Sequence, residues 1–272
     1  MIDEIPCKLC GSNNNSVVKE ITEKPNSEVD YGILTKDYYR QVRKCNNCEV
    51  YFNHHNDLIP IDFYKGQYNQ SIELKIKNRF DKIIKLPVGE SDNKNRVMRI
   101  IQFLYSIDRI HPNLSILDVG SGTGVFPYEV SKFGFKISAI DPDPNSINHI
   151  SAIPQINKTY CGNFDEIQLD EKYDLITFNK VLEHVANPIQ ILMLAKEKIH
   201  DNGIIYVELP YSGNSKTNIQ YERRTEFNIE HHFVFNHASL EYLISQAKLQ
   251  VINLENITDP SGKQTIFCFV SA

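Results

Sequence analysis

The sequence contains no tryptophan, only 3 methionines and no excess of basic residues. Its 29 lysines and arginines are outnumbered by 34 aspartates and glutamates, which gives a formal net charge of −5. Proteins that bind the phosphate backbone of nucleic acids are usually basic, so this balance argues against a nucleic-acid partner. The 14 tyrosines and 14 phenylalanines supply the aromatic bulk that tryptophan would otherwise provide.

Long apolar runs are also missing. No stretch approaches the roughly 18–20 apolar residues that cross a bilayer, so we expect no membrane span. The first residues are acidic and lead into no apolar segment, so we expect no secretory signal and a cytoplasmic location. With 272 residues, 41% hydrophobic and 23% charged, the composition is that of one large globular domain or of a domain with a small appendage.

Four of the six cysteines form two identically spaced Cys-x2-Cys pairs. The members of the pairs are Cys7, Cys10, Cys45 and Cys48. In a reducing compartment such pairs bind a metal more often than they form disulfides. Four thiolates make a closed tetrahedral zinc site, which is structural because no position remains for a substrate. We therefore expect one structural Zn²⁺ in a small lobe over residues 1–56, and we expect Cys161 and Cys268 to be core residues.

The rest of the chain changes its pattern near residue 113. Residues 57–112 are helical in pattern, with apolar side chains at i, i+3 and i+4 over 96–104. Beyond them, short apolar runs alternate with amphipathic stretches, which predicts an α/β fold with a parallel sheet covered on both faces. The last two runs, 250–256 and 265–270, are joined by a turn and predict an antiparallel hairpin at a sheet edge. The other expected strands are 115–119, 136–140, 173–178 and 204–208, and the expected helices are 125–133, 144–152, 187–200 and 237–247.

A glycine-rich turn lies between the first of these strands and the helix after it. Asp118 precedes the turn, which contains Gly120, Gly122 and Gly124. Glycine lets the backbone turn tightly and approach a ligand closely, while helix N–H groups face that ligand. The G-x-G-x-G spacing differs from the G-x-G-x-x-G of dinucleotide-binding proteins. Asp141 ends the next strand, where a carboxylate can accept both hydroxyls of a ribose; the alternative is that its Asp-Pro-Asp-Pro segment only forms a turn and a helix cap.

These residues resemble the S-adenosylmethionine site of class I methyltransferases. The resemblance covers 114–272 and implies a Rossmann-like fold with a mostly parallel, seven-stranded sheet and a terminal antiparallel hairpin. It implies that the glycine turn holds the methionine part of the cofactor, that Asp141 holds the ribose, that 162–164 lies beside the adenine and that 179–185 lines the methyl-transfer site. The implied cofactor-binding residues are Asp118, Gly120, Gly122, Gly124, Asp141, Asn163, Phe164 and Asn179. In the last segment, His184 is a catalytic candidate, with a purely structural role as the alternative.

A Glu-His pair, Glu230 and His231, follows the strand at 204–208. Histidine titrates near neutrality and an adjacent carboxylate can raise its basicity, so the pair is a candidate general base; a surface loop is the alternative. The cysteine lobe, the core, 207–211 and the Glu-His-x-Phe-x-Phe segment together resemble the deoxysugar C-methyltransferases, which act on nucleotide-linked keto-sugars. This resemblance implies that Glu230 and His231 deprotonate the carbon beside the ketone. Shorter relatives resemble enzymes of surface-polysaccharide pathways, where O-methylation is equally possible.

The sequence therefore predicts an S-adenosylmethionine-dependent methyltransferase that acts on a small molecule, a nucleotide-linked sugar or polysaccharide precursor, by C- or O-methylation. One alternative is a zinc-bearing RNA or DNA methyltransferase. Against it stand the acidic charge, the missing Asn-Pro-Pro-Tyr and Asp-Pro-Pro-Tyr motifs and the missing Pro-Cys nucleophile. A cofactor-binding protein without catalysis is the second alternative. The expected domains are a zinc lobe (1–56), a helical linker (57–112) and a methyltransferase domain (113–272), and the oligomeric state stays open.

Overall fold

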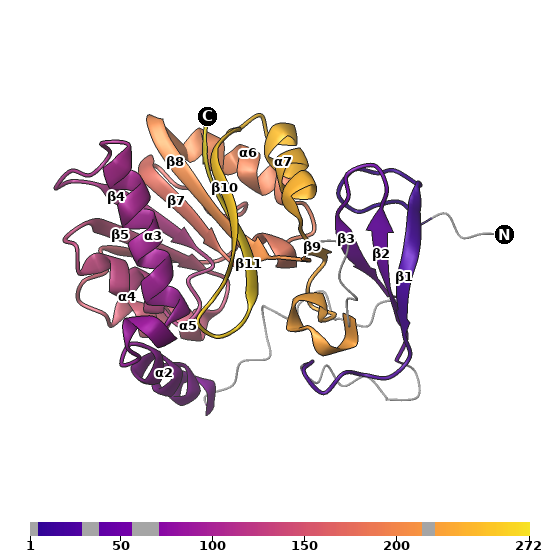
Figure 1. The fold of residues 1–272 in the computed structure, drawn as a ribbon. Coiled ribbons are helices and arrows are strands. Elements are labelled where there is room, and N and C mark those ends of the chain that lie inside the picture. Colours follow the sequence, from indigo (N-terminus) through magenta and orange to yellow (C-terminus); the bar gives the residue numbers. More distant parts are fainter. Residues whose placement is uncertain (1–4, 29–37, 56–70, 214–220) are drawn as a thin grey trace.

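The structure is a computed structural model that describes residues 5–28, 38–55, 71–213 and 221–272. The described chain folds into two β-sheets, one with four strands and one with seven. The smaller sheet lies beside the larger one, which carries helices on both of its faces (Figure 1). The first part of the expected helical linker, up to residue 70, falls outside the described residues.

The larger sheet has the strand order β10-β11-β8-β7-β4-β5-β6. Its strands are β4 (Ser115–Val119), β5 (Lys136–Asp141), β6 (Lys158–Cys161), β7 (Tyr173–Asn179), β8 (Ile199–Pro210), β10 (Gln250–Thr258) and β11 (Gln264–Ser271). The five strands from β4 to β8 run parallel, and β10 and β11 form an antiparallel hairpin that pairs with β8. The predicted Rossmann-like sheet with a terminal hairpin is confirmed. Strand β8 begins earlier than predicted because Ile199 already pairs with Tyr173, ahead of a register shift.

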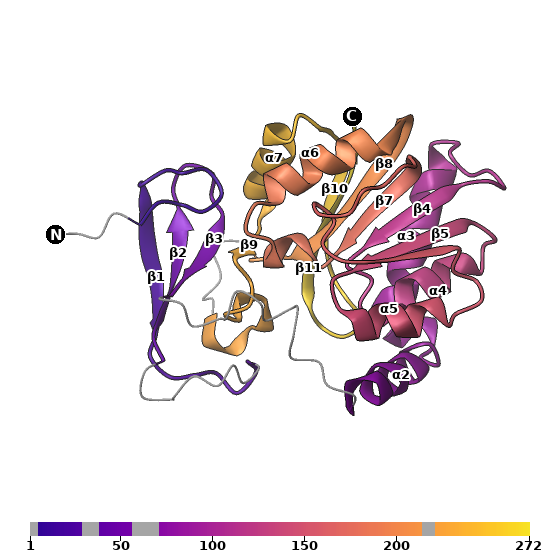
Figure 2. The ribbon, with the colours of Figure 1, turned by 180° about the vertical axis from the view of Figure 1, so that it is seen from behind.

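The helices lie in two layers on the faces of this sheet (Figures 1 and 2). They are α2 (Ser71–Ile83), α3 (Asp92–Ser106), α4 (Val125–Ser131), α5 (Pro144–Ser151), α6 (Pro188–Lys198) and α7 (His237–Gln246). Successive side chains of β4 point to opposite faces of the sheet. Ile116 packs in the core under α3 and α4, whereas Leu117 packs in the core under α6 and α7. None of the helices in the described ranges combines the length and the apolarity that a membrane span requires.

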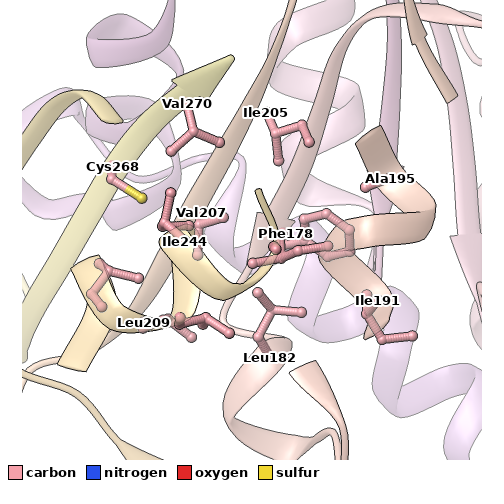
Figure 3. Packing of buried hydrophobic residues seen from close by; sticks show 14 of the residues in the cluster. Phe178, Leu182, Ile191, Ala195, Ile205, Val207, Leu209, Ile244, Cys268 and Val270 are labelled. Carbon is pink, nitrogen blue, oxygen red and sulfur yellow. The ribbon is translucent and has the colours of Figure 1, made fainter. Parts of the chain in front are cut away.

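The face under α6 and α7 contains the main apolar core. Phe178 of β7 and Val207 of β8 pack there with Ile244 of α7 and their neighbours (Figure 3). Cys268 lies in this core and is fully buried, as predicted. Cys161 is exposed, so its prediction as a core residue was wrong; it ends β6, which is an edge strand with no strand beyond it in the sheet.

The smaller sheet is antiparallel and combines three strands of the cysteine lobe with one strand from the segment after β8. Its strands are β1 (Asn15–Ile21), β2 (Arg40–Cys45), β3 (Tyr51–His54) and β9 (Phe233–Val234). Tyr51 pairs with Val234 and Phe52 with Phe233, so the fourth strand comes from the part of the chain that follows β8. Phe52 and Cys45 belong to the same apolar core as Phe233 and α7. The cysteine lobe is therefore continuous with the larger unit in its packing.

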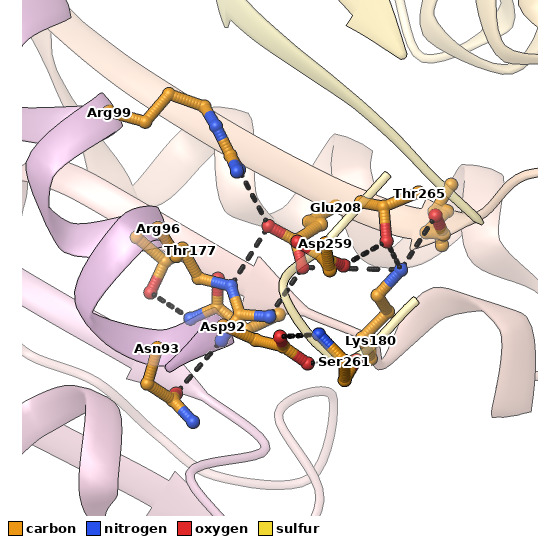
Figure 4. Close-up of polar contacts among 12 residues, drawn as sticks. Asp92, Asn93, Arg96, Arg99, Thr177, Lys180, Glu208, Asp259, Ser261 and Thr265 are labelled. Carbon is orange, nitrogen blue, oxygen red and sulfur yellow. Dashed lines mark hydrogen bonds and ion pairs between the residues drawn. The ribbon is translucent and has the colours of Figure 1, made fainter. Parts of the chain in front are cut away.

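A buried ion cluster fixes α3 on the sheet. Glu208 of β8 is fully buried and accepts hydrogen bonds from Arg96 Nε at 2.9 Å, Arg99 Nη1 at 3.0 Å and the Tyr206 hydroxyl at 2.6 Å (Figure 4). The Lys180 ammonium lies 4.0 Å away. Burial alone would raise the pKa of Glu208, but Arg96, Lys180 and Arg99 outweigh burial and hold the pKa well below its usual range. The carboxylate is therefore ionised and paired.

We expect Glu208→Gln to lower the free energy of unfolding by about 3–5 kcal/mol, because it leaves buried guanidinium groups without their counter-charge. Urea unfolding at neutral pH measures this loss. The exposed pair of Lys158 and Glu171 is the control, and Glu171→Gln should leave the urea midpoint unchanged. Equal midpoints for Glu208→Gln and the wild type would show that the cluster does not stabilise the fold.

Candidate active site

The glycine turn lies where parallel strands β4 and β5 end, which is where ligands bind in open α/β sheets. The N–H groups of Gly120 and Ser121 donate to the carbonyl oxygen of Ile140 at 2.8 and 3.0 Å, which attaches the turn to β5. Gly120, Gly122 and Gly124 have φ values of 71°, 53° and 76°, a region in which residues with a Cβ are strained. The sequence therefore needs glycine here for its backbone conformation.

The three glycines differ in what surrounds them. A Cβ on Gly120 would lie 2.5 Å from Val181, and a Cβ on Gly124 would lie 2.8 Å from Ile150, so both are required by packing as well. A Cβ on Gly122 would meet no atom within 4 Å. Gly122 thus borders open space at the strand ends, as a residue that a bound cofactor approaches closely must.

Asp118 is buried at the end of β4. Its Oδ1 accepts hydrogen bonds from Thr177 Oγ1 and Asn179 Nδ2, both at 2.7 Å, and burial raises its pKa to about 6 against the effect of these donors. The Oδ1 atom of Asn179 is buried and has no hydrogen-bond partner among the described residues. A buried acceptor without a donor is costly, so a ligand that donates a hydrogen bond fits here. In the structure Asp118 therefore orients Asn179, and its predicted contact with the cofactor stays a prediction.

Asp141 is buried at the end of β5. Its Oδ2 accepts from the N–H of Gly122 at 2.7 Å, and its Oδ1 accepts from the N–H of Asp143 at 2.9 Å. Burial raises its pKa. A carboxylate oxygen can accept two hydrogen bonds, and each oxygen of Asp141 accepts one in the structure. Each oxygen therefore has the capacity to accept a second bond from a ribose hydroxyl. Asp141 therefore supports the glycine turn and keeps the capacity to bind ribose.

The expected adenine segment follows β6. Asn163 is partly exposed and donates from Nδ2 to Glu166 at 2.9 Å, so its amide faces the next turn. Phe164 is buried and packs edge-on against Phe178, with ring centroids 5.8 Å apart. Phe164 thus links this segment to the core, and Asn163 is the more accessible of the two.

The structure brings His184 and His231 together. Their ring centroids are 4.8 Å apart, although the residues come from the segment after β7 and from the segment before β9. Nδ1 of His184 lies 3.1 Å from the carbonyl oxygen of Glu230, and Nδ1 of His231 lies 2.7 Å from that of Glu226. Glu230 therefore meets His184 through its backbone, and its carboxylate accepts from Asn228 Nδ2 at 3.2 Å.

The carbonyl contacts fix the form of both rings. A carbonyl oxygen only accepts hydrogen bonds, so Nδ1 carries a proton in each ring, and a neutral ring then has its lone pair on Nε2. Burial, with a further contribution from His184, lowers the pKa of His231 to about 3. The His231 imidazole is therefore neutral at physiological pH, with an Nε2 lone pair that can accept a hydrogen bond or bind a cation.

Comparison with known proteins decides the family. Residues 90–254 match the model of a family described as "Methyltransferase domain". The chain belongs to this family. It is a class I S-adenosylmethionine-dependent methyltransferase.

Curated relatives match about half of the chain. The chain is 27% identical over 161 residues to the mitochondrial ubiquinone biosynthesis O-methyltransferase of Schizosaccharomyces pombe, covering 54% of this chain and 58% of that protein. It is 29% identical over 149 residues to the ubiquinone biosynthesis O-methyltransferase of Rickettsia prowazekii, covering 50% and 59%. The chain spans somewhat more than half the length of these relatives.

Solved structures share the fold at low sequence identity. The plantazolicin methyltransferase BpumL, in complex with a pentazolic desmethylPZN analog and SAH, superposes with a TM-score of 0.57 at 14% identity, covering 74% of this chain and 91% of that one. An S-adenosylmethionine-dependent methyltransferase from Clostridium acetobutylicum gives a TM-score of 0.54 at 14% identity, covering 74% and 98%. These likenesses agree with the class I methyltransferase fold.

In this methyltransferase, buried polar side chains of the cysteine lobe hold the segment that carries His231. Asn53 donates from Nδ2 to the carbonyl oxygens of Asn228 at 3.0 Å and His231 at 2.8 Å, and its Oδ1 accepts from Arg40 at 2.7 Å. Arg40 also forms a fully buried ion pair with Glu28, whose Oε1 accepts from the N–H of Ile229 at 2.9 Å. The position of His231 therefore depends on the lobe.

The four cysteines of the two pairs also converge. Their sulfur atoms all lie within 4.8 Å of one another, with 3.7 Å between Cys7 and Cys48 and 3.5 Å between Cys10 and Cys45. None of the four forms a disulfide. Zinc–thiolate bonds of about 2.3 Å in a tetrahedron place sulfur atoms about 3.8 Å apart, so this arrangement fits a four-thiolate metal ion.

Sequence reasoning missed two polar residues of the site. Glu183 is 1% exposed beside His184, and its backbone oxygen accepts from the N–H of His232 at 2.7 Å. A charged residue next to a candidate histidine in an apolar stretch was a usable signal. Asn53 gave no signal, because its partners are distant in the sequence and are carbonyl oxygens.

We expect Gly122→Ala to weaken S-adenosylmethionine binding at least about tenfold, or about 1.4 kcal/mol, because the added methyl group enters the space beside the strand ends. Gly262→Ala is the matched control, since Gly262 also has positive φ and open surroundings but lies in the β10–β11 turn. Isothermal titration calorimetry measures both affinities. Similar affinity changes in the two variants would mean that only backbone strain matters.

Proposed function

We propose that this enzyme methylates a hydroxyl group of a small molecule, and that the acceptor is a nucleotide-linked sugar or another polysaccharide precursor. The observation that carries the proposal is the close approach of two imidazoles, His184 and His231, whose ring centroids are 4.8 Å apart. Val181 abuts Gly120 of the turn, and His184 follows Val181 within one short helix (Leu182–His184). A proton acceptor therefore lies close to the proposed cofactor site.

The proposed chemistry is an in-line displacement. Bound S-adenosylmethionine supplies a methyl group on a positively charged sulfur. The acceptor oxygen forms a bond to the methyl carbon, the carbon–sulfur bond breaks, and S-adenosylhomocysteine is released. The hydroxyl proton passes to Nε2 of an imidazole in the His184–His231 pair, while Asp141, Asn179 and the glycine turn hold the cofactor for the attack.

Two lines of support bear on the acceptor. The cysteine lobe and the Glu-His-x-Phe-x-Phe segment at Glu230–Phe235 favour a nucleotide-linked sugar. The names of the curated relatives, O-methyltransferases of ubiquinone biosynthesis, favour oxygen as the methylated atom. An acceptor from ubiquinone biosynthesis is the second candidate, because the curated relatives are named for that pathway.

A panel of acceptors separates these candidates. Purified enzyme with labelled S-adenosylmethionine is offered nucleotide-linked sugars, nucleotide-linked keto-sugars and hydroxylated ubiquinone precursors. We expect label in the first class, with the methyl group on oxygen in the mass-spectral fragments. Label on carbon of a keto-sugar would replace O-methylation by C-methylation, and label only in ubiquinone precursors would establish the second candidate.

We also propose that Cys7, Cys10, Cys45 and Cys48 hold a structural zinc ion. The ion would connect the segment of Cys7 and Cys10 to the turn between β2 and β3. Its site lies beside the apolar core that also contains residues of β9 and α7. Four protein ligands leave no open position, so the ion takes no part in methyl transfer.

If the four cysteines bind zinc, replacing one of them should remove the ion. Cys45→Ser should lose about one equivalent of zinc per chain and lower the thermal midpoint, because a structural zinc site contributes directly to folding. Cys161→Ser, at the exposed cysteine outside the cluster, should retain the wild-type zinc content. Metal analysis by mass spectrometry checks both, and a Cys45→Ser protein with the full zinc content would refute the assignment.

The acceptor-side proposal predicts a loss of turnover without a loss of cofactor affinity. His231→Gln keeps the size of the side chain but not its basic nitrogen, so turnover should fall by about 10²–10⁴-fold. S-adenosylmethionine affinity should stay near the wild-type value. His200→Gln, at an exposed histidine on β8, is the control. A His231→Gln enzyme that keeps a third or more of wild-type turnover contradicts the role.

A further inference from the structure

A second group of metal-ligand residues lies beside the proposed cofactor site. Glu183, His184 and His231 each offer one ligand atom, and the three atoms lie within 4.8 Å of one another. Two imidazoles and one carboxylate suit divalent transition metals such as Zn²⁺, Fe²⁺ and Co²⁺. The cysteine cluster differs in its chemistry, since sulfur is its only donor.

The carboxylate of Glu183 points to a bound cation. Glu183 is 1% exposed, and its Oε2 is buried with no hydrogen-bond partner in the described part of the chain. A buried carboxylate oxygen without a partner is costly. A cation held between this oxygen and the two imidazoles removes the cost.

The histidines are oriented as metal ligands usually are. Each donates its Nδ1 proton to a backbone carbonyl oxygen, His184 to Glu230 and His231 to Glu226. The hydrogen bond from Nδ1 fixes the orientation of the ring, so Nε2 is the atom that would bind the ion. The backbone of the cluster is fixed as well, because the N–H of His232 donates to the carbonyl oxygen of Glu183 at 2.7 Å.

Nearby charges of both signs affect a cation at this place. Burial is the main cause of the lowered pKa of His231, and His184, Lys180 and Lys263 lower it further; the two lysines oppose a cation. The Lys180 ammonium is committed elsewhere: it donates to the carbonyl oxygen of Leu209 at 2.9 Å and to Thr265 Oγ1 at 2.7 Å, and it lies 4.0 Å from the Glu208 carboxylate. Its hydrogen bonds therefore direct the ammonium to β8 and β11 and not to the cluster.

We propose that Glu183, His184 and His231 bind one divalent transition-metal cation. Three protein ligands leave positions open, so the ion can take the acceptor hydroxyl and ease loss of its proton. This catalytic part rests on the proposed methyl transfer, whereas the binding of the ion does not. With the ion bound, both imidazoles are ligands, so the hydroxyl proton passes to a water molecule instead of to Nε2, and the ion replaces the imidazole pair as the group that eases its loss.

Cobalt(II) added to the purified, zinc-containing protein tests the site. Histidine and carboxylate ligands give visible ligand-field absorption, whereas thiolate ligands add a charge-transfer band in the near ultraviolet. We expect about one equivalent of Co²⁺ to bind with the visible bands and without the thiolate band. Glu183→Gln and His231→Gln should each weaken Co²⁺ binding at least about tenfold. His232→Gln, the neighbouring histidine outside the cluster, should bind Co²⁺ as the wild type does.

Two results overturn the proposal: no visible bands in the wild type, or bands that persist in both Glu183→Gln and His231→Gln. Circular dichroism and urea unfolding confirm that each variant is folded, and if one of the two fails to fold, the other decides. The same samples separate this inference from the proposed function. Co²⁺ binding without methylation of any acceptor keeps the metal site and removes the function, whereas methylation without Co²⁺ binding does the reverse.

Discussion

The buried amide of Asn53 is the contact on which the acceptor side of this enzyme depends. It donates to the carbonyl oxygens of Asn228 and His231, while Glu28 accepts from the N–H of Ile229. Buried backbone groups must be paired, and this segment obtains several of its partners from the cysteine lobe. Arg40 neutralises Glu28 inside the same network. The lobe therefore acts as a scaffold for the segment that presents His231.

The proposed cofactor and acceptor halves of the site are built in different ways. The cofactor side is local: the glycine turn, Asp118 and Asp141 follow neighbouring parallel strands, and short hydrogen bonds hold them together. The acceptor side is assembled from the segment after β7, the segment before β9 and the lobe. Such a division lets one cofactor site serve different acceptors, because the second half can change while the strand ends stay the same.

Local signals in the sequence predicted most of the fold. The alternation of strands and helices, the glycine turn and the cysteine spacing all act over a few residues, and the sheet confirmed the first of them. Tertiary contacts were beyond this reasoning. The pairing of Phe52 with Phe233 and the approach of His184 to His231 join residues far apart in the sequence. The wrong prediction for Cys161 has a similar cause, since the sequence does not show that its strand lies at the edge of the sheet.

Hydrogen exchange in an Asn53→Leu variant tests the scaffold role of the lobe most directly. Leucine keeps the volume of the side chain but donates nothing to Asn228 and His231. The account predicts much faster exchange at the amides of Ile229 and His232, with unchanged protection in the parallel strands β4 and β7. Unchanged protection at those two amides would contradict it, because the segment would then hold its position without the lobe.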